Sequence, residues 1–376
     1  MNRRQFLSLS GKGMIGLALT GFAGPLLSCT DGRGGSYSIV LLGDTHFDTE
    51  PADVYHSHYN ETVEWLNRVQ RAEFARNGEM WRERCPRLLA RAERLIGRDT
   101  RMVMQMGDLI QGDCGSGEVH RQMLDDVMNR FKTALDGLPL VTVVGNHDIR
   151  GTDAHATYHD YMPRRTSQEL GCTIEKTTFS FRIGRDVFIV IDFNNPDDEE
   201  VERLLADSTD ARYTFVVVHG PVFPMDSPSA RWFYHGGNSE RETERRRHFR
   251  RLFAERNVIC LCGHTHTTEL YDWFGDDGRI TQMTLNSVWS HDELGTWKVD
   301  ADSPAQYGTL REGSKMDNGN AISDETALFD EYRPGLQRWI HSYSAGSYKL
   351  TVTPRHIYMD MYAGDSETCS QRFVLR

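Results

Sequence analysis

Cysteine is scarce in this sequence, with seven residues among 376 at irregular spacings. A fold held together by disulfides needs a denser and more regular set, so we expect free thiols, with Cys260 and Cys262 buried inside an apolar run. A series of long membrane-spanning runs is also missing. Hydrophobic residues at 39% and charged residues at 26% are instead typical of a soluble globular protein with a large core.

Basic residues are fewer than acidic ones. The sequence has 43 Lys and Arg residues and 54 Asp and Glu residues, which gives a formal net charge of −11. This balance disfavours broad attraction to nucleic acid, so no nucleic-acid partner is expected. The sequence shows no internal repeat and no appended second domain. Since α/β folds of roughly 200 to 300 residues often form one unit, we expect a single domain over residues 38–376.

Residues 1–28 have the pattern of an export signal. Arg3 and Arg4, followed by Phe6 and Leu7, precede a weakly apolar stretch rich in Gly, Ala and Leu. This pattern resembles a twin-arginine signal more than a spanning helix. The alternative is a Sec signal in which the arginine pair is only a basic start. Both interpretations predict an exported protein on the periplasmic or cell-surface side.

The end of this signal, Leu26-Leu27-Ser28-Cys29, resembles a bacterial lipobox. The resemblance implies cleavage before Cys29 and a lipid on its thiol, which would anchor the protein to a membrane surface. Residues 29–37 would then form the tether. The alternative is that Cys29 has no such role. No protein partner is expected.

Five short apolar runs rich in β-branched residues predict strands that are buried on both faces. They are residues 38–42, 102–106, 140–144, 214–218 and 258–262. Helical periodicity over residues 59–96 and 118–135 separates the first three runs, as strand-helix-strand units require. The sequence therefore predicts an α/β fold.

Further strands follow in two places. Residues 178–183 and 186–192 predict a hairpin that turns at Gly184 and Arg185. Three segments near the C-terminus alternate like antiparallel strands that complete the second sheet: residues 348–353, 356–362 and 371–375. Residues 295–320 lack periodicity and predict an irregular insertion. Two packed mixed β-sheets flanked by helices are the expected architecture.

Residues that can bind metal follow each of the five buried runs: Asp44 and His46; Asp108; Asn146, His147 and Asp148; His219; His264 and His266. Ligands of open α/β sheets bind at the carboxyl ends of the strands, so these distant residues can form one site. A glycine precedes or follows each group and would let the backbone turn sharply. One His-x-His alone is usually structural, but five ordered groups predict a metal site.

The ordered set resembles the calcineurin-like metallophosphoesterase family over roughly residues 38–286. The resemblance implies a four-layer fold and a dinuclear centre. Asp44, His46 and His266 would bind one metal ion, Asn146, His219 and His264 the other, and Asp108 would bridge them. The many imidazoles suit divalent transition metals such as Mn, Fe or Zn, whereas Mg alone would fit poorly.

The implied activity is hydrolysis of a small phosphorylated substrate by a metal-bound hydroxide. His147 would assist the leaving group, and Asp148 would orient His147; a helix-capping role for Asp148 is the alternative. Whether the substrate is a phosphomonoester or a phosphodiester stays open. The alternative from another class is an exported metal-binding lipoprotein whose site is vestigial or sensory.

Departures from better-defined branches of the family narrow the class. Gln111 stands where purple acid phosphatases carry a tyrosine, and they lack a counterpart of His46. The second motif lacks the arginine of protein Ser/Thr phosphatases, and Asp148 stands in place of their glutamate. An aromatic segment over residues 220–240, with Trp232 to His235, would either contact substrate or cap the core. His56, His58, Arg150 and His155 would either contact the phosphate or its ester group or have structural roles, and a structural role is the simpler explanation for each.

Overall fold

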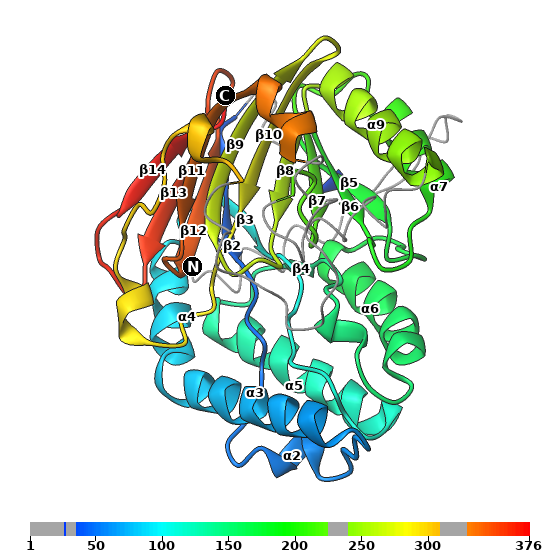
Figure 1. Cartoon of the computed structure of the whole chain (residues 1–376), viewed down its shortest axis with the longest axis vertical. Coiled ribbons are helices and arrows are strands. Elements are labelled where there is room, and N and C mark those ends of the chain that lie inside the picture. The colour runs from blue at the N-terminus through cyan, green and yellow to red at the C-terminus, as the bar shows by residue number, and fades with distance from the viewer. Residues whose placement is uncertain (1–25, 28–34, 225–239, 309–328) are drawn as a thin grey trace, which may run out of the picture.

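The computed structural model describes residues 26–27, 35–224, 240–308 and 329–376 (Figure 1). Most of the predicted signal, Cys29, and the aromatic residues Trp232 to His235 lie outside these ranges, and so do residues 309–320 of the predicted insertion. The described part of that insertion, from Gly295 to Gly308, contains a short 3-10 helix, Pro304–Gln306, and an isolated bridge between Ala301 and His341.

Two mixed β-sheets face each other (Figure 1). One sheet has six strands in the order β14-β13-β12-β2-β3-β4. Its members are β2 (Tyr37–Leu42), β3 (Thr100–Gln105), β4 (Leu140–Thr142), β12 (Gly346–Val352), β13 (Ile357–Ala363) and β14 (Gln371–Val374). Strands β2, β3 and β4 are parallel, and β12 pairs antiparallel with β2.

The other sheet has eight strands in the order β1-β5-β6-β7-β8-β10-β9-β11. They are β1 (Leu26–Leu27), β5 (Phe179–Ile183), β6 (Asp186–Ile191), β7 (Thr214–Val218), β8 (Ile259–Cys262), β9 (Thr268–Gly275), β10 (Gly278–Thr284) and β11 (Leu336–Ser342). The β5–β6 hairpin was predicted, whereas β9, β10 and β11 were not. The C-terminal strands β12, β13 and β14 were predicted to complete the second sheet. They lie instead in the six-stranded sheet, beside β2.

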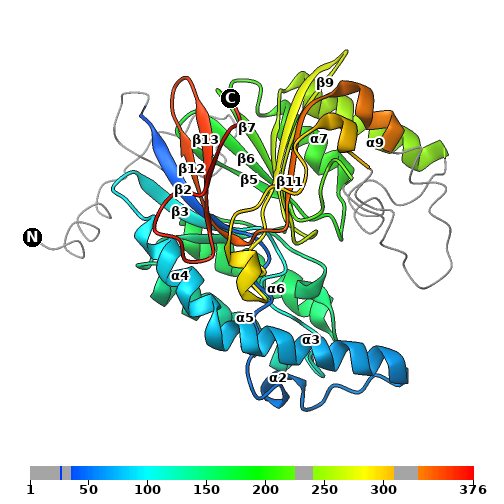
Figure 2. The same cartoon turned by 60° about the vertical axis from the view of Figure 1, so that its left-hand side comes forward.

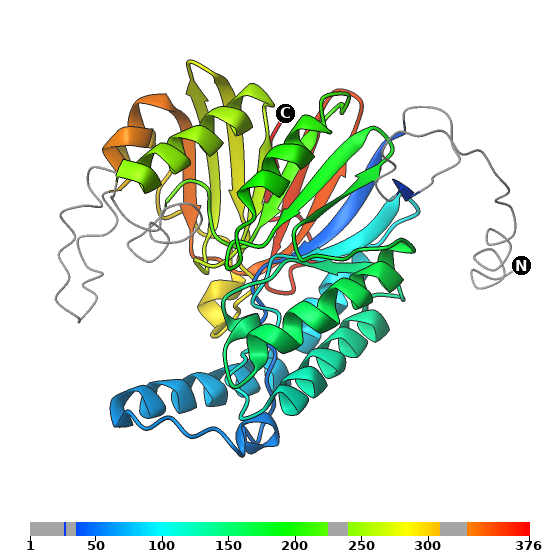
Figure 3. The same ribbon diagram turned by 90° about the vertical axis from the view of Figure 1, so that its right-hand side faces the viewer.

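Helices cover the outer faces of both sheets (Figures 1 and 3). The sheet of β2 is covered by α4 (Cys85–Arg94), α5 (Gly117–Ala134) and α6 (Ala154–Leu170), while α3 (Glu64–Glu83) packs against α4 and α2 (Asp53–His56) against α5. The other sheet carries α7 (Asp198–Ala206) and α9 (Glu240–Glu255). The predicted helix over residues 59–96 is split, because a new helix starts at Cys85 with Pro86 in its first turn.

Three apolar layers result from this arrangement. Ile39 and Leu41 of β2 point into the space between the sheets, whereas Val40 and Leu42 contact the layer under the helices. Strands β7 and β8 divide their side chains in the same way. These strands are thus buried on both faces, as their continuous apolar runs predict, and the predicted fold class is confirmed.

No disulfide forms among the six cysteines in the described part of the chain, and Cys260 and Cys262 are buried. Within the same ranges, no helix is both long and apolar enough to cross a membrane.

Candidate metal centre

Figure 2 shows the two sheets above the helices α3 to α6. The loops that follow β2, β3, β4, β7 and β8 bring their polar residues together. Backbone bonds join these loops. The amides of Thr45 and His46 both donate to the Asp108 carbonyl, at 3.1 and 2.8 Å, and the Gly263 amide donates to the His219 carbonyl at 2.9 Å. The strands therefore deliver their metal-binding residues to one place, although they belong to two sheets.

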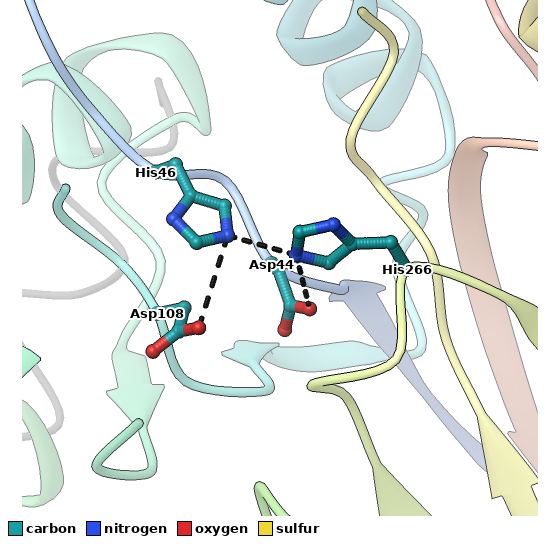
Figure 4. A group of neighbouring side chains, drawn as sticks. All are labelled: Asp44, His46, Asp108 and His266. Atoms are coloured by element: carbon teal, nitrogen blue, oxygen red, sulfur yellow. Dashed lines mark hydrogen bonds and ion pairs between the residues drawn. The ribbon is translucent and has the colours of Figure 1, made fainter. Parts of the chain in front are cut away.

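The first group of possible ligands consists of Asp44, His46, Asp108 and His266 (Figure 4). Nε2 of His46 lies 2.9 Å from Nε2 of His266 and 3.8 Å from Oδ2 of Asp108. Nε2 of His266 lies 3.4 Å from Oδ2 of Asp44. These nitrogen and oxygen atoms point at one another, and no Lys or Arg side chain of the group lies between them. Atoms that share a metal ion are expected to be arranged in this way.

The second group consists of Asp108, His219 and His264. Nδ1 of His219 donates to the Met106 carbonyl at 2.6 Å, which leaves Nε2 as the coordinating atom, 3.2 Å from Oδ2 of Asp108 and 3.2 Å from Nδ1 of His264. Asp108 belongs to both groups and is therefore the carboxylate that they share.

Asn146 shows a further feature of a ligand. Its side-chain oxygen is buried, and it has no hydrogen-bond partner among the described residues. A buried polar atom without a partner is costly in a native fold unless something else binds it. The residues present therefore fit divalent metal ions.

The backbone is strained at four of these ligands, which adopt left-handed conformations. The φ angles are 41° at His46, 49° at Asp108, 75° at His264 and 52° at His266. Such conformations cost about 1–3 kcal/mol each in residues other than glycine and cluster at functional sites.

The motif glycines serve mainly close packing and less often sharp turns. Gly107 has a positive φ of 88°, as a sharp turn requires. By contrast, Cβ atoms on Gly43, Gly145 and Gly263 would lie 2.3 Å from the Leu285 carbonyl oxygen, 2.1 Å from the Asp108 nitrogen and 2.4 Å from Asp44 Oδ1. Without side chains at these positions, the loops can approach closely enough to bring the ligands together.

Burial and mutual repulsion set the charges of the centre. Burial raises the pKa of Asp44 to about 8, and the nearby Asp108 adds to this effect. Burial also lowers the pKa of His46 and His264. In His219, burial opposes the charge, but the Asp108 and Asp44 carboxylates outweigh it and raise the pKa to about 9. Neutral imidazoles at His46 and His264 leave their lone pairs available for metal ions.

His147 lies beside the centre, with its ring edge-on to His46 at 4.5 Å between centroids. Its backbone amide donates to Oδ1 of Asp108 at 2.7 Å, and its Nδ1 donates to the Gln111 carbonyl at 3.0 Å. The Nε2 atom accepts from the Arg150 guanidinium at 3.2 Å. His147 is therefore placed for a role other than metal binding.

Asp148 does not orient His147 as predicted. Its carboxylate is fully buried and accepts from the backbone amides of Ile110 at 3.1 Å and Gly145 at 2.8 Å. It does not cap the next helix either, because α6 begins six residues later, at Ala154. Asp148 instead ties the loop after β3 to the loop after β4, and the Gln111 carbonyl orients His147.

Arg150 has more contacts than the sequence indicates. Its guanidinium lies 2.6 Å from Asp113, 2.8 Å from Gln70 and 3.4 Å from Glu73, in addition to His147. Gln70 and Glu73 belong to α3 and lie about one turn apart, so this turn of the helix faces Arg150. No local signal in the sequence links this helix to Arg150. Gly78 lets α3 pack closely against the segment after β2, because a Cβ at this position would lie 2.5 Å from the Thr49 carbonyl oxygen.

The fold and this site together define a class of protein, the metal-dependent phosphoester hydrolases. The chain belongs to the calcineurin-like phosphoesterase family, whose match covers residues 37–268. A search of curated proteins found no relative.

Several solved structures resemble the chain. A purple acid phosphatase, PPD1, from yellow lupin (Lupinus luteus) seeds has a TM-score of 0.50 and 13% identity, covering 91% of this chain and 54% of that one. This chain thus spans about half the length of the lupin protein. PhoD has a TM-score of 0.47 and 11% identity, with coverage of 90% and 68%. GAP50, the anchor in the inner membrane complex of Plasmodium, has a TM-score of 0.45 and 12% identity, with coverage of 91% and 89%. The lupin match supports the fold.

Proposed function

We propose that the chain hydrolyses a small phosphate ester with two divalent transition-metal ions that share Asp108. The observation that carries this proposal is the position of Asp108, whose carboxylate belongs to both ligand groups. When bound, two such ions would activate water for attack at neutral pH and would offset the charge of the phosphoryl group. Asp44, His46 and His266 would hold one ion, and His219, His264 and Asn146 the other.

The remaining residues of the site complete the assignment. Met106 and Gln111 orient His219 and His147 through their backbone carbonyls. Arg150, held by Asp113 and by α3, places a fixed positive charge beside Nε2 of His147. The guanidinium of Arg150 would stabilise negative charge on the leaving oxygen, and His147 would add to this once it is protonated on Nε2. Gln111 bonds to Asn77 and Glu73 through its side chain, away from the ligand groups, which argues against a site of the ferric-tyrosinate type.

Metal analysis tests this proposal. Purified protein lacking residues 1–28, loaded with Mn, Zn or Fe, should bind close to two ions per chain and hydrolyse members of a phosphomonoester and phosphodiester panel. A chelator should abolish the turnover. Elemental analysis that finds no bound metal after loading would exclude the mechanism. Two bound ions without turnover on any ester would favour the vestigial or sensory alternative.

We also propose that the protein is exported and held at a membrane surface through lipidated Cys29. The support is the order of the arginine pair, the weakly apolar stretch and the lipobox-like end in the sequence. Cys29→Ser should move the protein from the membrane fraction to the soluble fraction without changing turnover per molecule. Exposed Cys369 provides the matched control, because Cys369→Ser should leave the protein in the membrane fraction. Wild-type protein that is already soluble after export would contradict the anchor.

A further inference from the structure

A cavity of about 450 Å³ opens directly beside the metal centre. His266, a member of the first ligand group, lines it together with Arg76 of α3 and residues of the segment after β10. Cavities of roughly 300–1,000 Å³ are typical of small-molecule sites. A substrate whose phosphate contacts the metal centre would extend into this space on the side of His266.

The charges in the lining cancel. Arg76 and Lys298 are balanced by Glu293 and Asp300, and Lys298 Nζ lies 3.0 Å from Oδ1 of Asp300. An additional anionic group on the substrate would meet carboxylates here, and an acyl chain would leave several charged groups without water. A neutral group with many hydroxyls fits best, because hydroxyls can donate to carboxylates and accept from cations.

Tyr343 adds a rigid aromatic surface to the cavity. Its amide donates to Oδ2 of Asp300 at 3.1 Å, and its carbonyl accepts from Nδ2 of Asn286 at 3.0 Å. Its ring packs edge-on against His341 with centroids 4.7 Å apart. The residue is nevertheless 50% exposed. An aromatic ring held in place but open on one side can cover the apolar C–H face of a ring-shaped alcohol.

We propose that this cavity binds the leaving alcohol of the substrate and that this alcohol is small, neutral and rich in hydroxyls, of the sugar or cyclic polyol class. Tyr343 covers its C–H face, and Glu293 and Asp300 accept from its hydroxyls. This inference rests on the proposed function, because the bound alcohol is a leaving group only if the protein hydrolyses a phosphate ester.

Binding of the free alcohol tests the cavity without turnover. Saturation-transfer NMR on the metal-free full chain should detect contact with glucose or myo-inositol but not with hexanol. Tyr343→Ala should weaken that binding about tenfold, and Tyr343→Phe should restore it. The control is Phe274→Ala, which removes a similarly exposed aromatic ring (47%) at the far end of β9 and should change nothing.

Kinetics with the metal-loaded protein separate this inference from the proposed function. The KM for a sugar or polyol phosphate should rise about tenfold in Tyr343→Ala, with a smaller change in kcat. Turnover of esters without detectable binding of either alcohol would overturn the inference and leave the proposed function standing. Alcohol binding that depends on Tyr343 without turnover of any ester would support the cavity and refute hydrolysis. Tighter binding of hexanol than of glucose would also overturn the inference.

Discussion

Asp108→Asn is expected to lose metal and activity together. Asp108 supplies the carboxylate that both ligand groups share, with Oδ2 lying 3.8 Å from His46 Nε2 and 3.2 Å from His219 Nε2. An amide keeps the shape of the side chain but removes the negative charge that holds two cations close together. Bound metal should fall from about two ions to at most one per chain, and turnover should fall by at least ~10³-fold.

Asp277→Asn is the matched control for this change. Asp277 is exposed in the turn between β9 and β10, at the opposite end of β9 from the loop that carries His264 and His266. This variant should keep both metal content and turnover. Elemental analysis and a turnover assay on both variants measure the effect. Full metal occupancy in Asp108→Asn would show that Asp108 is not the bridge.

His147→Ala should behave differently, because His147 lies beside the ligand groups and binds Gln111 and Arg150. We expect metal content to stay intact and turnover to fall roughly 10²- to 10⁴-fold, the usual range for acid-base assistance. The loss should depend on the leaving group. An alkoxide is a poor leaving group and needs stabilisation, whereas a nitrophenolate leaves readily as an anion.

The measurement compares alkyl and aryl phosphate esters together with elemental analysis. His356→Ala, at an exposed position before β13, should have no effect and serves as the control. Equal losses on both ester types with full metal occupancy would assign His147 to substrate binding. Loss of one metal ion would make it a ligand.

Local patterns in the sequence predicted which residues gather at the candidate centre. Each ligand group follows an apolar run that forms a strand, and the carboxyl ends of such strands meet because parallel pairing and a buried core leave few other arrangements. Asp44, His46, Asp108, His219, His264 and His266 were therefore expected in one place, and the structure brings them together. Strands β9 and β10 were missed, although Asp277 and Gly278 at their turn are a usual hairpin signal.

What the sequence alone determined is the set of ligand residues and the alternation of strands and helices, because both depend on neighbours within a few positions. The tertiary structure decided which distant groups those residues meet. The C-terminal strands joined β2 because β12 pairs along its free edge. Asp148 accepts hydrogen bonds from backbone amides of two loops and not from the His147 ring. Arg150 contacts Gln70 and Glu73, which precede it by 80 and 77 positions. Such contacts depend on how whole elements pack, and periodicity within one element does not encode that packing.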